Sequence, residues 1–179
     1  MITRVKTMMH RPSILLTTGG LVFLSVLSRI VGLLRDRLLT SEFGTSGILD
    51  SYFSAFRIPD LVYNFLILGT LSSAFIPLFS RYLHKKDGMK QAQDLVDDLL
   101  LFVSLIMGMM SLIIFLGAPW LTKIVALSYE GQKLADTILL TRIMALSPFI
   151  FSISSIVSSI LNTYKKFFIA ALAPIFYNL

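Results

Sequence analysis

The most regular feature of the sequence is a series of long apolar stretches separated by short polar segments. Three of them, residues 61–80, 99–122 and 143–164, contain no Asp, Glu, Lys or Arg. About 20 residues of helix cross the hydrocarbon core of a bilayer, so each stretch is long enough to span a membrane. A shorter apolar stretch at 167–179 is predicted to begin a further span. The pattern predicts an all-α fold, a polytopic transmembrane helix bundle.

The polar segments set the predicted boundaries. Residues 1–12 are predicted to form a basic cytoplasmic segment, and residues 13–179 the transmembrane bundle. The predicted spans are about 13–39, 58–81, 95–122 and 139–164, with the start of a fifth at 167–179. Pro59 lacks a backbone donor and restricts its neighbour, so a helix start or kink is expected there. Because the fifth span is short, we expect the chain to be part of a longer polypeptide.

Composition supports a membrane protein and offers no candidate for catalysis. Charged residues make up 15% of the chain, against about 25% in soluble domains, and the mean hydropathy is +0.80. There is no cysteine, and the two histidines are not spaced to share a metal ion. No phosphate-binding glycine loop, HExxH motif or Ser/His/Asp arrangement occurs. We therefore predict a protein that is not an enzyme and has no metal site or cofactor.

The net charge of +6 is concentrated in three segments, 4–11, 81–90 and 165–166. Four complete spans place all three segments on the same side of the membrane, which the positive-inside rule assigns to the cytoplasm. We therefore predict a multi-pass protein of the bacterial cytoplasmic (inner) membrane with a cytoplasmic N-terminus. Membrane lipids are expected partners, and nucleic acid is not, because the cations lack an aromatic binding platform.

The first predicted span carries an arginine, Arg29, inside an otherwise apolar stretch. A charge at membrane depth costs roughly 3 kcal/mol on insertion scales, so it usually faces a bundle interior or a wet cavity. Polar and small residues recur at helical spacing and form one face of this span: Thr18, Ser25, Ser28, Arg29, Gly32 and Asp36. We expect this face to line a polar space inside the bilayer.

The fourth predicted span also has a polar face, for which two interpretations stay open. The face consists of Ser147, Ser154, Ser155, Ser158 and Asn162. Serines are common where membrane helices pack closely, which is the structural interpretation. The alternative is that this face lines a cavity opposite the first span.

Five sequence segments resemble one known family when taken together and in order. They are SRIVGLLRDRLLTSEFG, LDSYFSAFRIPD, GTLSSAFIPLFSRYL, GAPW and ILNTYKKFFIAALAP. The combination resembles the N-terminal third of the MurJ/MviN-type lipid II flippases of the MOP superfamily. The resemblance implies a two-lobed, fourteen-span transporter of which this chain is a partial first lobe. It also implies translocation of lipid II, the undecaprenyl-pyrophosphate-linked peptidoglycan precursor, to the outer leaflet by alternating access.

The resemblance further implies a set of substrate-binding residues, Arg29, Arg35, Asp36 and Asp50. Arginine suits a pyrophosphate because its planar fork stays charged and binds two oxygens at once. Other residues are candidates for lining the cavity: Ser25, Ser28, Arg57, Ser155, Ser158 and Asn162. The chain departs from better-known members at Tyr63, Asn64 and Leu68, where those proteins carry charged residues.

Two other functions remain open at this stage. One is an ion-coupled exporter or polysaccharide-unit translocase of the same superfamily, which a requirement for an undecaprenyl-pyrophosphate substrate would separate from a flippase. The other is an inactive partial or scaffold membrane protein. A reading frame that continues past residue 179 would argue against the second.

Overall fold

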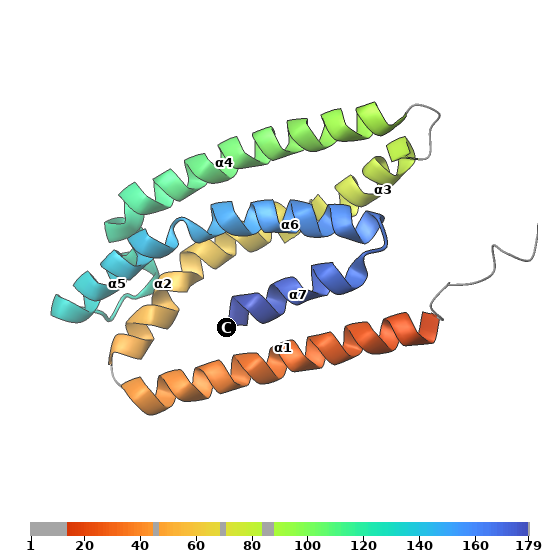
Figure 1. The fold of residues 1–179 in the computed structure, drawn as a ribbon. Helices are drawn as coiled ribbons and strands as arrows, with labels where there is room; N and C mark the ends of the chain where they lie inside the picture. Colours follow the sequence, from red (N-terminus) through yellow and green to blue (C-terminus); the bar gives the residue numbers. More distant parts are fainter. Residues whose placement is uncertain (1–13, 45–46, 69–70, 84–87, 179) are drawn as a thin grey trace, which may run out of the picture.

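The structure is a computed structural model that describes residues 14–44, 47–68, 71–83 and 88–178. These residues form an all-α bundle, and no strand occurs among them (Figure 1). The helices are α1 (Ile14–Phe43), α2 (Gly47–Tyr63), the π-helical segment η1 (Asn64–Leu68), α3 (Leu71–Leu83), α4 (Gly88–Val125), α5 (Gly131–Met144), α6 (Ser147–Thr163) and α7 (Phe167–Asn178).

Three helical segments are long and apolar enough to cross a membrane: Thr18–Phe43, Gly88–Val125 and Gly131–Thr163. The predicted second span falls on α2, η1 and α3. Helix α2 begins at Gly47 and continues through Pro59, so no helix starts at the proline. The predicted fourth span covers α6 and the end of α5, and Pro148 lies in the first turn of α6. Proline is favoured there because the first backbone N–H groups of a helix have no partner within it.

Helix α1 lies at the margin of the described structure. It pairs with α7, whereas α4 packs against α2, α3, α5 and α6 (Figure 1). Only 6% of the α1 span is buried, against 22% and 28% of the other two spans. The bundle is therefore densest around α4 and opens toward α1.

The core is formed by α3, α4 and α6. Its buried residues are Phe75, Phe79, Ala92, Val103, Met107 and Ile156. The rings of Phe75 and Phe79 stack with centroids 5.1 Å apart. Met107 is 1% exposed, and its flexible side chain fills the centre of this core.

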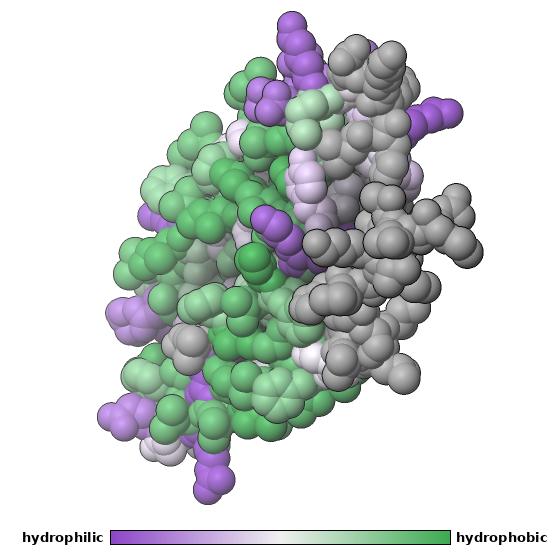
Figure 2. Space-filling model, turned by 45° about the vertical axis from the view of Figure 1, so that its right-hand side comes forward, coloured by the Kyte–Doolittle hydropathy of each residue, from purple (hydrophilic) through white to green (hydrophobic). Residues whose placement is uncertain are grey.

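Large apolar side chains also cover much of the outside, as Figure 2 shows for one face of the molecule. Examples on α1 and α4 are Phe23, Leu33, Phe102, Leu105 and Leu116, all more than half exposed. Soluble monomers rarely expose apolar patches of this extent. The outer surface is therefore that of a membrane protein.

Most helix ends lie at two opposite ends of the bundle. The start of α1, the end of α3, the start of α4 and the α6–α7 turn share one end, and the end of α1, the start of α2 and the α4–α5 turn share the opposite end (Figure 1). At the α6–α7 turn, Lys165 adopts a φ of 59°. The N–H of Lys166 then donates to the carbonyl of Leu161 at 2.8 Å, which closes the end of α6 as a Schellman motif. This turn reverses the chain and lays α7 against α1.

Candidate functional site

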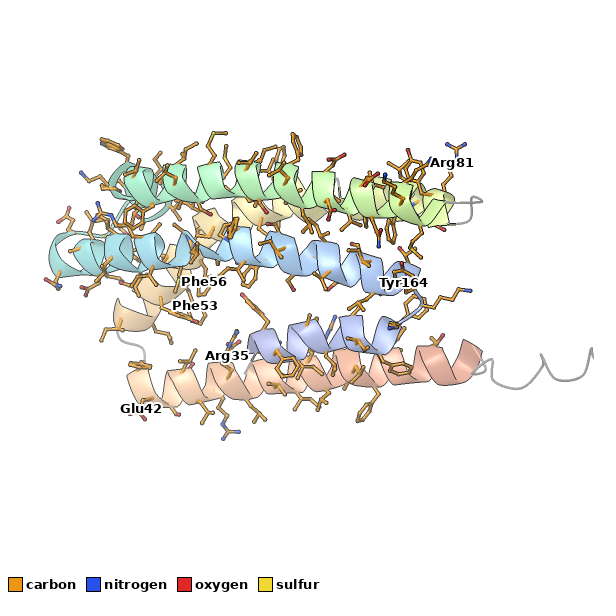
Figure 3. The ribbon with its side chains drawn as sticks, turned by 45° about the horizontal axis from the view of Figure 1, so that its top comes forward. Arg35, Glu42, Phe53, Phe56, Arg81 and Tyr164 are labelled. Carbon is orange, nitrogen blue, oxygen red and sulfur yellow. The ribbon has the colours of Figure 1, made fainter. Side chains whose placement is uncertain are left out.

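The Arg35 side chain extends from α1 toward the part of α2 that carries Phe53 and Phe56 (Figure 3). Its Nε and Nη2 atoms donate to Oδ1 of Asp36 at 3.1 and 2.9 Å. Its Nη1 donates to Oδ1 of Asn178 at 3.3 Å. The Arg35 side chain is 32% exposed, so the guanidinium is held by two partners and still reaches open space.

Asn178 joins α7 to α1 at this point. Its Nδ2 donates to the carbonyl and hydroxyl oxygens of Ser28 at 3.2 and 3.1 Å, and to the carbonyl of Pro174 at 3.0 Å. The Asn178 amide packs directly over Gly32, since a Cβ at this position would lie 3.4 Å from the amide carbon and oxygen. These partners fix the orientation of the Asn178 amide, because its oxygen accepts a hydrogen bond from Arg35 and its nitrogen donates to oxygen acceptors. Asn178 therefore positions Arg35 from the neighbouring helix.

A cavity of about 210 Å³ lies beside this cluster. Its lining residues are Arg35, Tyr52, Phe53, Phe56, Arg57, Asp60 and Tyr177. The ring of Tyr52 makes edge contacts with Phe53 and Phe56, with centroids 5.4 and 5.1 Å apart. Aromatic side chains beside a guanidinium lower the local dielectric, which strengthens its attraction to an anion. The chemistry of this smaller cavity suits an oxyanion such as a phosphate.

A larger cavity of about 700 Å³ adjoins the smaller one, since Asp60 and Tyr177 line both. Residues of α2, η1, α6 and α7 line it: Asp60, Tyr63, Asn64, Ile150, Phe151, Ser154, Ser155, Ser158, Ala170, Ala173, Pro174, Phe176 and Tyr177. Phe151 makes edge contacts with Tyr63 and Tyr177, with centroids 5.7 and 5.1 Å away. Among the described residues, the cationic side chains that line these adjoining cavities are Arg35 and Arg57, and both line the smaller one.

The structure brings several of the residues singled out in the sequence to this space. Arg35 and Arg57 line the smaller cavity, and Ser155 and Ser158 line the larger one. Asp36 holds Arg35 without lining either cavity. Ser28 is buried and accepts hydrogen bonds from Asn178.

Other residues from the sequence lie elsewhere. Arg29 and Ser25 are exposed on α1 and line neither cavity, and the Ser25 hydroxyl donates to the carbonyl of Leu21 at 2.9 Å. Asn162 is half-buried near the end of α6 and also lines neither cavity. The polar face of the first span is thus divided between a part that meets α7 and a part that faces outward.

Asp50 belongs to a separate cluster between α2 and α5. Its Oδ2 accepts a hydrogen bond from Nζ of Lys133 at 2.8 Å. The same Nζ lies 4.1 Å from the centroid of the Tyr129 ring, and the Tyr129 hydroxyl is 3.1 Å from that of Ser54. The structure gives Asp50 an ion-pair partner and does not place it with Arg35.

Several site residues were not singled out in the sequence, and those with polar groups include Asp60, Tyr52, Tyr177 and Asn178. Asp60 and Asn178 could have been identified from the sequence, because each is a polar residue at the edge of, or within, an apolar stretch. Such residues are costly in a bilayer and often have a function there. The two tyrosines could not have been identified in this way, because aromatic residues are common in membrane spans and at their ends. Within the described ranges, no group of three or more His, Cys, Asp or Glu residues is placed to hold a metal ion.

The fold and the cavities define a polytopic α-helical membrane protein with an arginine-lined polar space between its helices. The sequence model of the family described as lipid II flippase MurJ matches residues 39–179. The chain therefore belongs to the lipid II flippase MurJ family, a family of bacterial membrane proteins.

Curated relatives agree with this assignment. The lipid II flippase MurJ of Burkholderia cenocepacia is 33% identical over 166 residues, which cover 92% of this chain and 31% of the relative. A probable lipid II flippase MurJ of Buchnera aphidicola subsp. Acyrthosiphon pisum is 34% identical, over 87% of this chain and 31% of the relative. One from Treponema pallidum is 30% identical, over 95% and 32%. The chain spans about a third of the length of these relatives.

Proposed function

We propose that this chain is the partial first lobe of a longer transporter, not an enzyme, that moves lipid II across the bacterial cytoplasmic membrane by alternating access. The observation that carries the proposal is the smaller cavity, which is lined by both Arg35 and Arg57 together with aromatic side chains. Membership of the flippase family supplies the substrate, an undecaprenyl-pyrophosphate-linked precursor of the cell wall.

The charges beside this cavity explain how a pyrophosphate could be bound and released. Both contacts of Arg35 with Asp36 go to a single carboxylate oxygen, so the pair is not a full two-by-two fork. A phosphate oxygen that approaches Arg35 competes with Asp36 for the same N–H groups. Asp36 therefore holds the guanidinium ready when the cavity is empty and is displaced when substrate binds.

Arg29 and Asp50 have different places in this proposal. Arg29 lies about two helical turns before Asp36 on a similar side of α1, where it offers a second cation outside the two cavities. Asp50 acts through its ion pair with Lys133, which links α2 to α5 at one end of the bundle. Alanine variants of Arg29 and Asp50 test both assignments in the same transport measurement that is used for Arg35.

The test is Arg35→Ala and Arg35→Lys in the complete transporter. Transport is measured as exposure of lipid II at the outer leaflet, normalised to the amount of protein in the membrane. Alanine should abolish transport, and lysine should impair it strongly because a point charge does not replace a planar fork. Arg37→Ala is the matched control, since Arg37 is exposed on the same helix and lines neither cavity. Normal transport by Arg35→Ala would refute the proposed site.

The proposal includes an orientation with the N-terminus in the cytoplasm. The described basic residues Arg81, Lys90, Lys165 and Lys166 all belong to one end of the bundle, which the positive-inside rule assigns to the cytoplasm. Single cysteines at the exposed positions Glu42, Lys90 and Ser128 test it in this cysteine-free chain. An impermeant maleimide applied to intact cells should label positions 42 and 128 and spare position 90. The reverse pattern would invert the orientation.

A further inference from the structure

The serines of α6 fall into two groups that differ in how their hydroxyls are satisfied. Those of Ser147, Ser152 and Ser159 donate to carbonyls of the same chain segment at 2.7, 2.7 and 2.9 Å. This is the usual solution for a serine on a membrane helix.

The second group is Ser154, Ser155 and Ser158, which all line the larger cavity. Their hydroxyls make no hydrogen bond with any residue that the structure describes. An unpaired hydroxyl costs free energy in an apolar environment, so these groups face water or a polar ligand. Three such hydroxyls on one wall indicate a ligand that offers several hydrogen-bonding groups.

The opposite walls add complementary features. Asn64 contributes an amide and Asp60 a carboxylate, while Tyr63, Phe151 and Tyr177 form a row of rings in edge contact. No Lys or Arg within the described ranges lines this larger cavity, so these residues do not select an anion. Its volume of about 700 Å³ lies within the range of roughly 300–1,000 Å³ typical of pockets for small organic ligands.

Flat apolar faces combined with hydroxyl, amide and carboxylate groups are what a sugar ring requires. The C–H faces of a pyranose stack on aromatic rings, and its hydroxyls exchange hydrogen bonds with polar side chains. A hydrocarbon chain would suit the aromatic rings but would leave the serine hydroxyls, Asn64 and Asp60 without partners. The chemistry of the lining therefore favours a saccharide over a lipid tail.

We propose that the larger cavity is a saccharide-binding subsite, in which Ser155 and Ser158 bind sugar hydroxyls and Tyr63 and Tyr177 provide stacking surfaces. Because Asp60 and Tyr177 line both cavities, a sugar here would lie next to a phosphate at Arg35 and Arg57. The inference rests on the proposed function and specifies its substrate: the saccharide of the lipid-linked precursor contributes to recognition in this lobe.

The test measures binding of two probes to the complete transporter in lipid nanodiscs. One probe is undecaprenyl pyrophosphate, which has no sugar, and the other is undecaprenyl pyrophosphate carrying a disaccharide without peptide. In the double variant Ser155→Ala/Ser158→Ala, loss of two hydrogen bonds should raise the Kd of the disaccharide probe about tenfold. The Kd of the sugar-free probe should change less than twofold.

Ser159→Ala is the matched control, because Ser159 is the next residue on α6 and its hydroxyl is already bonded to the Ser155 carbonyl. It should leave the ratio of the two dissociation constants unchanged. Arg35→Ala should weaken the binding of both probes equally, and this result would separate the phosphate site from the sugar site.

Three results would overturn the saccharide subsite. The first is equal affinity of the wild-type protein for both probes, and the second is an equal loss of affinity for both probes in the double variant. The third is tighter binding of the sugar-free probe by the double variant, which would indicate a hydrocarbon chain in the cavity. Failure of the proposed function gives a different result, since wild-type protein would then bind neither probe.

Discussion

The α4–α5–α6 part of the bundle and the α1–α2–α7 part use similar polar residues in opposite ways. In the first, buried hydroxyls pair within the protein. The hydroxyl oxygens of Thr122 and Thr141 are 3.3 Å apart, and the Thr141 hydroxyl donates to the carbonyl of Thr137 at 2.8 Å. In the second, Arg57 and Asp60 line cavities and form no ion pair with the residues that the structure describes.

The difference separates polar residues that hold helices together from polar residues that await a ligand. Small residues and self-bonded hydroxyls let α4 approach α5 and α6 closely, which is how membrane helices gain stability. Guanidinium and carboxylate groups left without partners reduce stability, so their retention indicates a functional constraint. Stability should therefore depend mainly on the buried, paired residues of the first region, and transport mainly on the residues of the second region and of α6 that line the cavities.

The largest expected effect on stability is in the packed region. Met107 is 1% exposed in the core, and Met107→Ala should destabilise the complete protein by about 2–5 kcal/mol because it leaves a cavity. Thermal unfolding in detergent measures the change. Met109→Ala is the control, since Met109 is 55% exposed two residues along the same helix and should have little effect. Equal stability of the two variants would contradict the assignment of the core to this face of α4.

A smaller effect on stability, combined with a loss of transport, is expected at Asn178. Asn178→Ala removes the amide that links Ser28 to Arg35 and should cost about 1–3 kcal/mol. Transport should fall because Arg35 loses its partner on α7. Asn162→Ala is the matched control, because Asn162 is also half-buried but lines neither cavity.

A double-variant cycle shows whether Asn178 acts through Arg35. Transport is measured for Asn178→Ala in the wild-type background and in the Arg35→Lys background, which is expected to retain some activity. If Asn178 acts by positioning the guanidinium, the two variants should not have additive effects. Fully additive losses would mean that Asn178 has a separate role.

The sequence was sufficient to predict the all-α membrane fold, because runs without charge are long and unambiguous. It was less informative about the second predicted span, where Pro59 indicated either a helix start or a kink and the structure shows that α2 continues through it. The pairing of Asp50 with Lys133 and of Arg35 with Asn178 depends on contacts over 83 and 143 residues of sequence. Helical periodicity identifies the face of one helix and says nothing about which distant residue meets it.

The smallest expected effect has the opposite sign and concerns Ser111 on α4. Its Oγ is buried and, alone among the buried side-chain polar atoms of the described residues, has no hydrogen-bond partner. Removing an unpaired buried hydroxyl relieves its desolvation cost, so Ser111→Ala should stabilise the protein by about 1 kcal/mol. Ser152→Ala should do the reverse, since that buried hydroxyl donates to the carbonyl of Phe149 at 2.7 Å. Thermal unfolding of both variants of the complete transporter measures the two changes in stability.

If Ser111→Ala destabilises the protein as Ser152→Ala does, the Ser111 hydroxyl has a partner outside the described residues. This face of α4 is then not a purely internal packing surface.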